Sequence, residues 1–308
     1  MTSTSAMRSL GLAVSVSLAA ASPALAQPQN LEQTEIKINK VTDSFYSLDG
    51  SGGTIGVLTG PDGVLMVDSQ YAALTGKIVA AIKTISDGRI RFLVDTHVHG
   101  DHTGGNENFG RLGVTIVARE PLRSRLMKPN AAANGTPGVP MPAPGLPVVT
   151  YEGTMTFHIN GEAVQLIAVP AAHTDGDTMV WFPNNDVLMI GDFYRSIQYP
   201  NIDRANGGSL KGMLDGLDAA IKMAGPRTKI IPGHGPTVDK TALVATRAMI
   251  ADVRDKIAAM VARGMTSEQV VAAKPTAAYD ANVQMPGTTA DRFAGQVYAE
   301  VKGARGER

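Results

Sequence analysis

Cysteine is absent from this 308-residue chain. Without cysteine the protein forms no disulfide bonds, and any metal ion must be held by histidine, aspartate or glutamate side chains. A surplus of charge is also absent, because 28 Lys and Arg residues balance 28 Asp and Glu residues. A formal net charge of zero gives no support for a polyanionic partner, so we do not expect nucleic-acid binding.

Apolar runs long enough to span a membrane are absent as well. The run that comes closest to this length lies near the N-terminus. There Arg8 precedes an apolar segment, residues 10–20, and small residues at 24–26 follow it. This order is typical of a secretory signal peptide, and the segment is shorter than the roughly 20 apolar residues of a membrane helix. We therefore predict a signal peptide over residues 1–26 and a single mature domain over residues 27–308, periplasmic or secreted and without membrane contact.

Apolar residues make up 44% of the chain and glycine occupies 33 positions, which suits one large core with many turns. Periodicity and turn signals predict strands at residues 35–48 (an edge strand), 54–58, 64–68, 90–94, 114–118, 155–159, 164–169, 178–182, 187–191 and 229–235. They predict helices at residues 71–85, 106–112, 121–127, 209–223, 239–263, 267–274 and 289–301. Two strand-rich halves, each followed by helix, indicate an α/β protein with two sheets inside and helices outside.

Residues 130–147 break this pattern, since they are mostly Ala, Gly and Pro and carry no charge. Repeated proline prevents both helix continuation and strand pairing. A surface loop in polyproline conformation is the simpler interpretation. The alternative is an apolar lip over a functional site, a role that long ordered loops often have in enzymes.

Histidine is concentrated in one short segment. Directly after the predicted strand at residues 90–94, His97, His99, Asp101 and His102 fall within six positions. Alternate side chains of an extended segment point the same way, so His97 and His99 can hold one metal ion. Asp101 and His102 follow and can face a second ion nearby. A zinc ion takes about four ligands, so further donors must come from elsewhere in the chain.

The further donors are single residues that follow other predicted strands. His173 and Asp192 each come after an apolar strand, and His234 lies in a Gly-His-Gly segment. Five of the six histidines thus occupy small-residue loops after strands, a distribution that core histidines do not show. The sixth, His158, lies inside a strand and is predicted to be an ordinary strand residue.

This pattern, His-x-His-x-Asp-His followed by His173, Asp192 and His234, resembles that of the metallo-β-lactamase superfamily over nearly all of the mature chain. The resemblance implies a four-layer αββα sandwich of two mixed sheets, with two zinc ions between the sheets at one edge. It also implies the ligand sets: His97, His99 and His173 for the first zinc ion, Asp101, His102 and His234 for the second, and Asp192 as the bridge between them. Asp68 matches the family's aspartate at the end of an early strand.

Two zinc ions would supply the chemistry of a hydrolase. They lower the pKa of bound water toward about 7 and polarise a carbonyl, so that a metal-bound hydroxide can attack it. Asp101 can orient the hydroxide or relay its proton to the leaving group. Asp68 and Asp95 are candidates to steady the histidine ligands, or to cap turns. Tyr194 is a candidate donor to the oxyanion, and Arg195 is a candidate ligand for a substrate carboxylate, although packing and a surface salt bridge explain these two residues equally well.

The aspartate at position 192 weakens the case for a β-lactam substrate and strengthens that for other substrates of the family. The best-known β-lactamases of the family carry cysteine at this place and another subclass leaves serine there, whereas glyoxalase II, lactonases and phosphodiesterases carry a bridging carboxylate. His99 stands where the iron-binding flavoprotein branch usually has glutamate, which argues against that branch.

These observations predict an exported dinuclear zinc hydrolase of small cyclic amides or esters, with a β-lactam antibiotic as the leading substrate. The alternative is a lactonase of the acyl-homoserine-lactone type or a glyoxalase II-like thioesterase. A phosphodiesterase or nuclease is the alternative from another class, and neutral charge and export argue against it. A non-catalytic metal-binding domain is opposed by the completeness of the ligand set. The residue pattern specifies no oligomeric state.

Overall fold

The computed structural model describes residues 31–131, 136–284 and 287–306. From Leu31 onward the chain forms one compact unit. The predicted signal peptide, residues 1–26, lies outside the described residues. Within the described part of the chain, no helix combines the length and the apolar composition that crossing a membrane requires.

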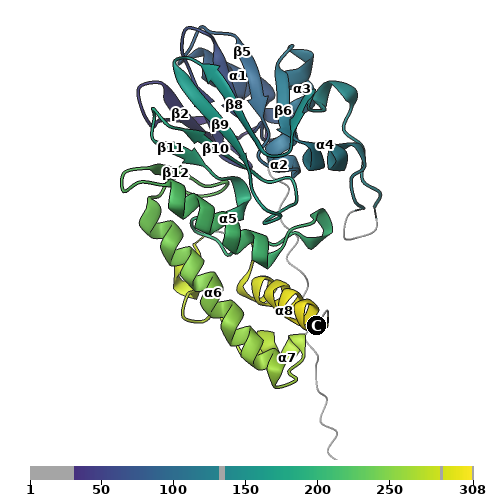
Figure 1. Ribbon diagram of the computed structural model, residues 1–308. Coiled ribbons are helices and arrows are strands. Elements are labelled where there is room, and N and C mark those ends of the chain that lie inside the picture. The colour runs from purple at the N-terminus through teal and green to yellow at the C-terminus, as the bar shows by residue number, and fades with distance from the viewer. Residues whose placement is uncertain (1–30, 132–135, 285–286, 307–308) are drawn as a thin grey trace, which may run out of the picture. The chain divides into compact units, whose positions relative to one another are not determined.

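The first half of the chain forms a seven-stranded sheet whose strands follow sequence order from β1 to β7 (Figure 1). The strands are β1 (Lys37–Lys40), β2 (Phe45–Asp49), β3 (Ile55–Leu58), β4 (Val64–Val67), β5 (Ile90–Val94), β6 (Thr115–Arg119) and β7 (Val149–Tyr151). Neighbours are antiparallel from β1 to β4 and parallel from β4 to β7. The parallel pairs β4–β5 and β5–β6 are joined by crossovers that contain α1 (Thr75–Lys83) and α3 (Asn106–Arg111).

The second sheet has five strands in the order β12-β11-β10-β9-β8. They are β8 (Thr154–Ile159), β9 (Glu162–Ala168), β10 (Thr178–Phe182), β11 (Val187–Met189) and β12 (Lys229–Ile231). Strands β8 to β11 are antiparallel, whereas β12 pairs in parallel with β11 after the crossover through α5 (Leu210–Met223). Asn160 and Gly161 have φ angles of 55° and 70°, as a two-residue turn between β8 and β9 requires.

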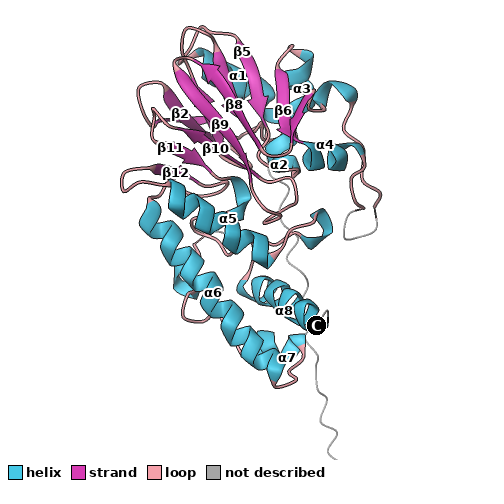
Figure 2. Cartoon of the chain, in the orientation of Figure 1, coloured by secondary structure: helices cyan, strands magenta, loops and turns pink. Residues whose placement is uncertain are grey.

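The remaining helices are α2 (Gly100–Thr103), α4 (Glu120–Met127), α6 (Lys240–Ala262), α7 (Ser267–Ala272) and α8 (Ala290–Gly306). Single 3-10 turns are η1 (Ala72–Leu74), η2 (Ala143–Gly145), η3 (Gly191–Phe193), η4 (Arg204–Asn206) and η5 (Asp280–Asn282). Helices α5 and α6 begin at side-chain caps, where Ser209 and Asp239 accept backbone N–H groups. Figure 2 shows α5, α6, α7 and α8 together on one side of the strands.

Alternating burial along the strands sorts these elements into four layers. In β4, Leu65 and Val67 face the cluster between the two sheets, whereas Val64 and Met66 face the cluster under α1 and α3. On the other side, α5 lies next to the outer face of the five-stranded sheet, and α6 packs against α5 and α8 against α6 in the same apolar cluster (Figure 1). The predicted αββα sandwich of two mixed sheets is therefore confirmed.

The predicted edge strand at residues 35–48 is wrong in one respect, because the structure forms two strands there. β1 and β2 pair antiparallel across a turn in which the Phe45 amide donates to Thr42 Oγ1 at 3.0 Å. The loose alternation of this stretch does not reveal the turn. β7 was not predicted, since only three residues of it pair with β6.

The described part of the proline-rich segment, residues 130–131 and 136–147, packs beside α4. The Met141 amide donates to the Leu126 carbonyl oxygen at 2.9 Å. Met141 also joins Leu126 and Val98, a neighbour of two of the histidines, in a small apolar cluster. These contacts are those of a packed surface loop.

Candidate metal centre

The segment between β5 and α3 carries four of the predicted ligands. His97 and His99 lie on the link between β5 and α2, whereas Asp101 and His102 lie on α2. The amides of His102 and Thr103 donate to the His99 carbonyl oxygen at 3.0 and 2.9 Å. This tight turn changes the chain direction between the two pairs of ligands.

Segments that follow strands of the second sheet bring the other ligands to the same place. His173 follows β9, Asp192 lies in η3 directly after β11, and His234 follows β12. The seven side chains form two groups, in each of which the potential ligand atoms lie within 4.8 Å of one another. The first group is His97, His99, His173 and Asp192, and the second group is Asp101, His102 and His234. The structure thus brings together all seven predicted ligands.

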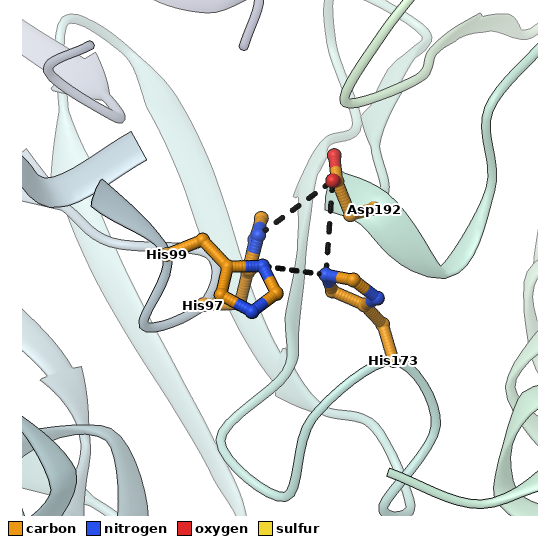
Figure 3. A group of neighbouring side chains, drawn as sticks. All are labelled: His97, His99, His173 and Asp192. Carbon is orange, nitrogen blue, oxygen red and sulfur yellow. Dashed lines mark hydrogen bonds and ion pairs between the residues drawn. The ribbon is translucent and has the colours of Figure 1, made fainter. Parts of the chain in front are cut away.

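In the first group, three imidazole rings gather beside the Asp192 carboxylate (Figure 3). Asp192 Oδ2 lies 3.8 Å from His97 Nε2 and 3.7 Å from His173 Nε2. His173 Nε2 lies 2.9 Å from His99 Nδ1. Ligand atoms on a tetrahedral zinc ion, with bonds of roughly 2.0–2.1 Å, are about 3.4 Å apart. The observed spacings suit one such ion.

Two rings of the first group are held by acceptors on their far side. His173 Nδ1 lies 2.6 Å from the Asn201 carbonyl oxygen, and His99 Nε2 lies 2.7 Å from Asp203 Oδ2. A proton held on the far nitrogen leaves the near nitrogen with a free lone pair. Metal-binding histidines need this tautomer, and such acceptors select it.

The second group is more open to solvent. His234 Nε2 lies 3.1 Å from Asp101 Oδ2 and 3.4 Å from His102 Nε2. The side chains of Asp101 and His234 are 23% and 16% exposed, whereas that of His102 is fully buried. In the first group only the side chain of His99 is comparably exposed, at 25%, so a substrate would approach along the face that Asp101, His234 and His99 share.

Asp68 connects the two groups, as the sequence predicted for a residue that steadies histidines. Its Oδ2 atom lies 2.7 Å from His102 Nδ1 and accepts the Thr96 hydroxyl at 2.8 Å. Thr96 Oγ1 in turn lies 3.0 Å from His97 Nδ1. One buried carboxylate thus orients a ring of the second group directly and a ring of the first group through Thr96.

Asp192 contacts both groups with its two oxygens. Beyond its contacts in the first group, Oδ1 lies 3.3 Å from His102 Nε2 and Oδ2 lies 3.4 Å from His234 Nε2. A carboxylate in this position can bind two ions at once, as the paired metals of hydrolases require.

Burial sets the proton affinity of the first group. It lowers the pKa of His97 well below the ordinary histidine value and that of His173 to about 3. Burial would raise the pKa of Asp192, but Arg195 and the surrounding histidines hold it well below its usual range. Neutral rings beside an ionised carboxylate are ready to bind a cation at neutral pH.

Carboxylates set the proton affinity of the second group. Burial alone would lower the pKa of His102, but Asp192 and Asp68 raise it well above the ordinary value. At His234 burial is likewise outweighed by the carboxylates of Asp192 and Asp101, which raise its pKa. Without metal, these rings therefore bind protons more readily than the rings of His97 and His173, and protons compete with a metal ion for them.

Two buried atoms of the first group show that the site fits metal ions. Among the described residues, His97 Nε2 and Asp192 Oδ1 are buried and have no hydrogen-bond partner. Buried polar atoms are normally satisfied, so such orphans call for an explanation. A ring nitrogen and a carboxylate oxygen left without partners in a cluster of His and Asp side chains are the donors that a metal ion such as zinc takes up.

Two glycines let the backbone approach the ligands closely. A Cβ atom on Gly53 would lie 2.0 Å from His102 Cε1, and one on Gly233 would lie 1.8 Å from Asp192 Oδ1. The Gly53 amide also donates to the Asp101 carbonyl oxygen at 3.0 Å. A side chain at either position would displace a ligand.

The prediction that Asp95 steadies a histidine is wrong. Asp95 is fully buried, and its Oδ2 atom accepts from Asn106 Nδ2 at 2.8 Å. Its amide donates to the Val117 carbonyl oxygen at 3.0 Å. Asp95 therefore fixes α3 to the end of the sheet, while its neighbour Thr96 makes the contact with the ligand His97.

The prediction that Tyr194 serves the reacting atoms is also wrong. Tyr194 is 2% exposed and packs in the apolar cluster between the five-stranded sheet and α5, α6 and α8. Burial raises the pKa of its hydroxyl, which bonds to Thr246 on α6. The chain leaves η3 extended at Tyr194, and this side chain packs into the core.

Arg195 points to the metal centre instead. Its Nε atom donates to Asp192 Oδ2 at 3.1 Å and its Nη2 atom contacts the same oxygen, while Nη1 donates to Gln198 Oε1 at 3.2 Å. The side chain is 12% exposed, so it does not form a surface salt bridge. Binding of a substrate carboxylate by Arg195 stays a prediction.

The sequence did not reveal two carboxylates that position ligands. Asp203, which holds His99, lies 104 positions after it in a segment without regular structure. Asp177 accepts the His173 amide at 2.6 Å and the Thr174 hydroxyl at 2.5 Å, and burial raises its pKa to about 7. For Asp177, the run of small residues from His173 to Asp177 was a signal in the sequence. For Asp203 the sequence contains no comparable signal.

Known proteins share this sequence pattern. The model of the metallo-beta-lactamase superfamily matches residues 48–235. The linear primary-alkylsulfatase of Pseudomonas sp. (strain ATCC 19151) is 24% identical over 257 residues, covering 70% of this chain and 48% of that enzyme. The metallo-beta-lactamase type 2 of Elizabethkingia meningoseptica is 22% identical over 234 residues, covering 73% of this chain and 89% of that enzyme. The chain thus spans about half the length of the alkylsulfatase that it matches.

Solved structures share the fold. A metallo-beta-lactamase from Pontibacter korlensis superposes with a TM-score of 0.59 at 21% identity, covering 71% of this chain and 100% of that one. The sec-alkylsulfatase of Pseudomonas sp. superposes with a TM-score of 0.64 at 17% identity, covering 85% and 50%. With a family match over more than half of its length and a cluster of His and Asp side chains that fits metal ions, the chain belongs to the metallo-β-lactamase superfamily of hydrolases.

Proposed function

We propose that the protein is a dinuclear zinc hydrolase that opens the carbonyl of a small cyclic amide or ester. The observation that carries the proposal is Asp192, whose two oxygens lie 3.3 to 3.8 Å from ring nitrogens of both groups. A carboxylate that lies between two groups of metal ligands favours two metal ions, bridged by that carboxylate, over a single ion. Zinc suits a donor set of histidine and aspartate without cysteine.

Metal ions held by the two groups would lower the pKa of a water molecule and polarise the substrate carbonyl. The chain itself contributes proton transfer through Asp101, a partly exposed carboxylate beside His234. Asp101 can accept the proton of the attacking water and pass it to the leaving group. Arg195 keeps Asp192 ionised, and it also lines a pocket of about 190 Å³ with Gln198 and Tyr199, where a substrate carboxylate can meet its guanidinium.

A β-lactam is the leading substrate, supported by the predicted export and by the similarity to a metallo-beta-lactamase over 89% of that enzyme. A sulfate ester is the second candidate, favoured by the match to an alkylsulfatase, although this chain covers only 48% of that enzyme. Because residue 192 is an aspartate, as the resemblance to lactonases, glyoxalase II and phosphodiesterases implies for a bridging ligand, lactones, thioesters and phosphodiesters are further substrates to test.

A substrate panel tests the proposal. Zinc-supplemented protein is assayed with a carbapenem, a cephalosporin, an acyl-homoserine lactone, a thioester, a primary alkyl sulfate and a bis-nitrophenyl phosphate. We expect the highest kcat/KM for a β-lactam, with the alkyl sulfate as the second candidate, and loss of the activity in His97→Ala. The matched control is His158→Ala, which removes the exposed histidine of β8 and should leave the activity unchanged. Equal activity of His97→Ala and His158→Ala contradicts the proposal.

We also propose that the protein is exported, on the basis of the signal-peptide pattern in residues 1–26. Mass spectrometry of the N-terminus in periplasmic and cytoplasmic fractions tests this proposal. The expected mature chain begins at Gln27 and lies outside the cytoplasm. A chain that keeps residues 1–26 and stays in the cytoplasm contradicts export without affecting the proposed chemistry.

A further inference from the structure

A pocket of about 460 Å³ lies beside the metal centre, between β1, β2, the start of β12 and the segment that follows His234. Three lysines line it: Lys37 and Lys40 on β1 and Lys229 at the first position of β12. The proposed hydrolase chemistry makes no use of this pocket.

The lining carries more positive than negative charge. Asp49 is the one carboxylate among its lining residues, and it accepts from Asn39 Nδ2 at 2.7 Å. Lys40 is bound to Asp43 at 3.0 Å, but no ion pair joins Lys37 or Lys229 to a carboxylate of the described residues. Lys37 and Lys229 thus line one cavity without an ion pair to a described carboxylate, although Lys37 lies opposite Asp49 in the ladder between β1 and β2.

Lys229 is held in place by a backbone contact. Its Nζ atom donates to the Val41 carbonyl oxygen at 2.8 Å, across the opening between the two sheets. An ammonium group fixed by one neutral acceptor keeps its charge and two donors for a ligand.

The lysine pocket continues into the metal centre. A second pocket, of about 310 Å³, is lined by His234 and Gly52, and four residues line both pockets: Asp49, Thr54, Gly235 and Pro236. One molecule can therefore reach from the exposed ligand His234 to the lysines. The lysine and hydroxyl side chains that line the outer pocket supply hydrogen-bond donors for an oxyanion.

We propose that the lysine pocket binds an anionic group, a carboxylate or sulfate, at the far end of a substrate whose reacting bond lies beside His234. Only the position of the reacting bond beside His234 rests on the proposed hydrolase function. The lysine pocket selects elongated substrates with a negative charge remote from the scissile bond, and Lys37 and Lys229 determine that preference. Asp49, between the two pockets, weakens the attraction, so its charge has the opposite effect on anion binding.

A binding experiment tests the pocket without requiring turnover. Succinate is titrated calorimetrically into zinc-supplemented full chain at low ionic strength, where exposed charges are least screened. We expect Lys37→Gln/Lys229→Gln to bind succinate about tenfold more weakly, and Asp49→Asn to bind it severalfold more tightly, as one or two partly exposed charges allow. The control Lys83→Gln/Lys222→Gln removes the same charge from exposed positions of α1 and α5 and should bind as the parent does.

Opposite shifts in the two pocket variants exclude a general effect on folding. The proposal is overturned if the parent does not bind succinate, if the pocket and control double variants bind it equally, or if Asp49→Asn weakens binding. Succinate can also bind the zinc ions, so the differences between variants, and not the parent affinity, report on the pocket.

A kinetic experiment separates this proposal from the proposed function. Two esters are compared, 4-nitrophenyl butyrate and the mono-4-nitrophenyl ester of adipic acid, which carries a free carboxylate. In Lys37→Gln/Lys229→Gln we expect KM for the charged ester to rise about tenfold with kcat unchanged, and KM for the neutral ester to stay the same. Equal KM changes for both esters overturn the pocket, whereas absence of turnover of both esters by the parent contradicts ester hydrolysis and leaves the binding result to judge the pocket.

Discussion

The two ligand groups that meet at Asp192 differ in burial and in proton affinity. In the first group, burial keeps His97 and His173 neutral by lowering the pKa of each ring. In the second group, nearby carboxylates raise the pKa of His102 and of His234, so these rings bind protons more readily. Protons therefore compete with a metal ion more strongly in the second group than in the first, and we expect the first group to bind metal more tightly at neutral pH.

Removal of Asp192 should have the largest effect, because its two oxygens lie next to ligand atoms of both groups. Loss of a partner of a bound ligand typically costs 10–100-fold in metal affinity or activity, so Asp192→Ala should lower hydrolysis by more than about a hundredfold. It also leaves the guanidinium of Arg195 without its carboxylate. Metal analysis and kcat/KM measure the effect, and Asp215→Ala on α5, which breaks only an exposed pair with Lys211, is the control. Full metal content in Asp192→Ala would contradict its bridging position.

A change at Gly53 should break the second group and spare the first. The added methyl of Gly53→Ala would lie 2.0 Å from His102 Cε1, so the ring must move. We expect one metal ion instead of two, and a large loss of activity. Gly76→Ala in α1, where a Cβ meets no atom within 4 Å, should leave metal content unchanged and the fold equally or slightly more stable. If Gly53→Ala keeps both ions, the backbone at Gly53 does not constrain the second group.

The carboxylates behind the rings allow one group to be weakened more than the other. Asp203→Asn removes the charged acceptor of His99, and Asp68→Asn removes that of His102. Each should lower metal affinity by about 10–100-fold, the first mainly in the first group and the second mainly in the second group. Competition with a chromophoric chelator measures the two affinities. Identical affinity changes in both variants would show that the groups do not act as separate sites.

Lowering the pH should release the metal ion of the second group before that of the first, and this is the smallest of the expected effects. The rings with raised pKa values take up protons first as the pH falls, and protonation competes with metal at the second group. His173, with a pKa of about 3, stays neutral over the same range. Between about pH 8 and about pH 5, where histidine normally titrates, the protein should pass from two bound ions to one. The metal content is measured after equilibration against buffers of falling pH. Loss of both ions together would contradict the expected difference in metal affinity between the two groups.

Most of the metal centre followed from the sequence, because the ligands end strands whose apolar runs are easy to recognise. His97 to His102, His173, Asp192 and His234 each follow such a run, and strand ends of packed sheets meet at one edge. The layers were predictable for the same reason, since strands buried on both faces read as continuous apolar segments.

The errors lie where side-chain direction depends on contacts distant in sequence. Tyr194 is two positions after a ligand, yet it packs under α6, while Arg195 turns to Asp192. Asp203 meets His99 across 104 positions, and no periodicity reports such a contact. Proximity in sequence to a ligand therefore predicted the place of Tyr194 and Arg195 but not the atoms that they touch.

The zinc content of single-ligand variants tests the central claim most directly. Native mass spectrometry of the zinc-loaded parent should show two ions per chain. His234→Ala, which removes a ligand of the second group only, should show one, and His158→Ala should show two. One ion in the parent, or two ions in His234→Ala, would contradict a pair of unlike metal sites joined by Asp192.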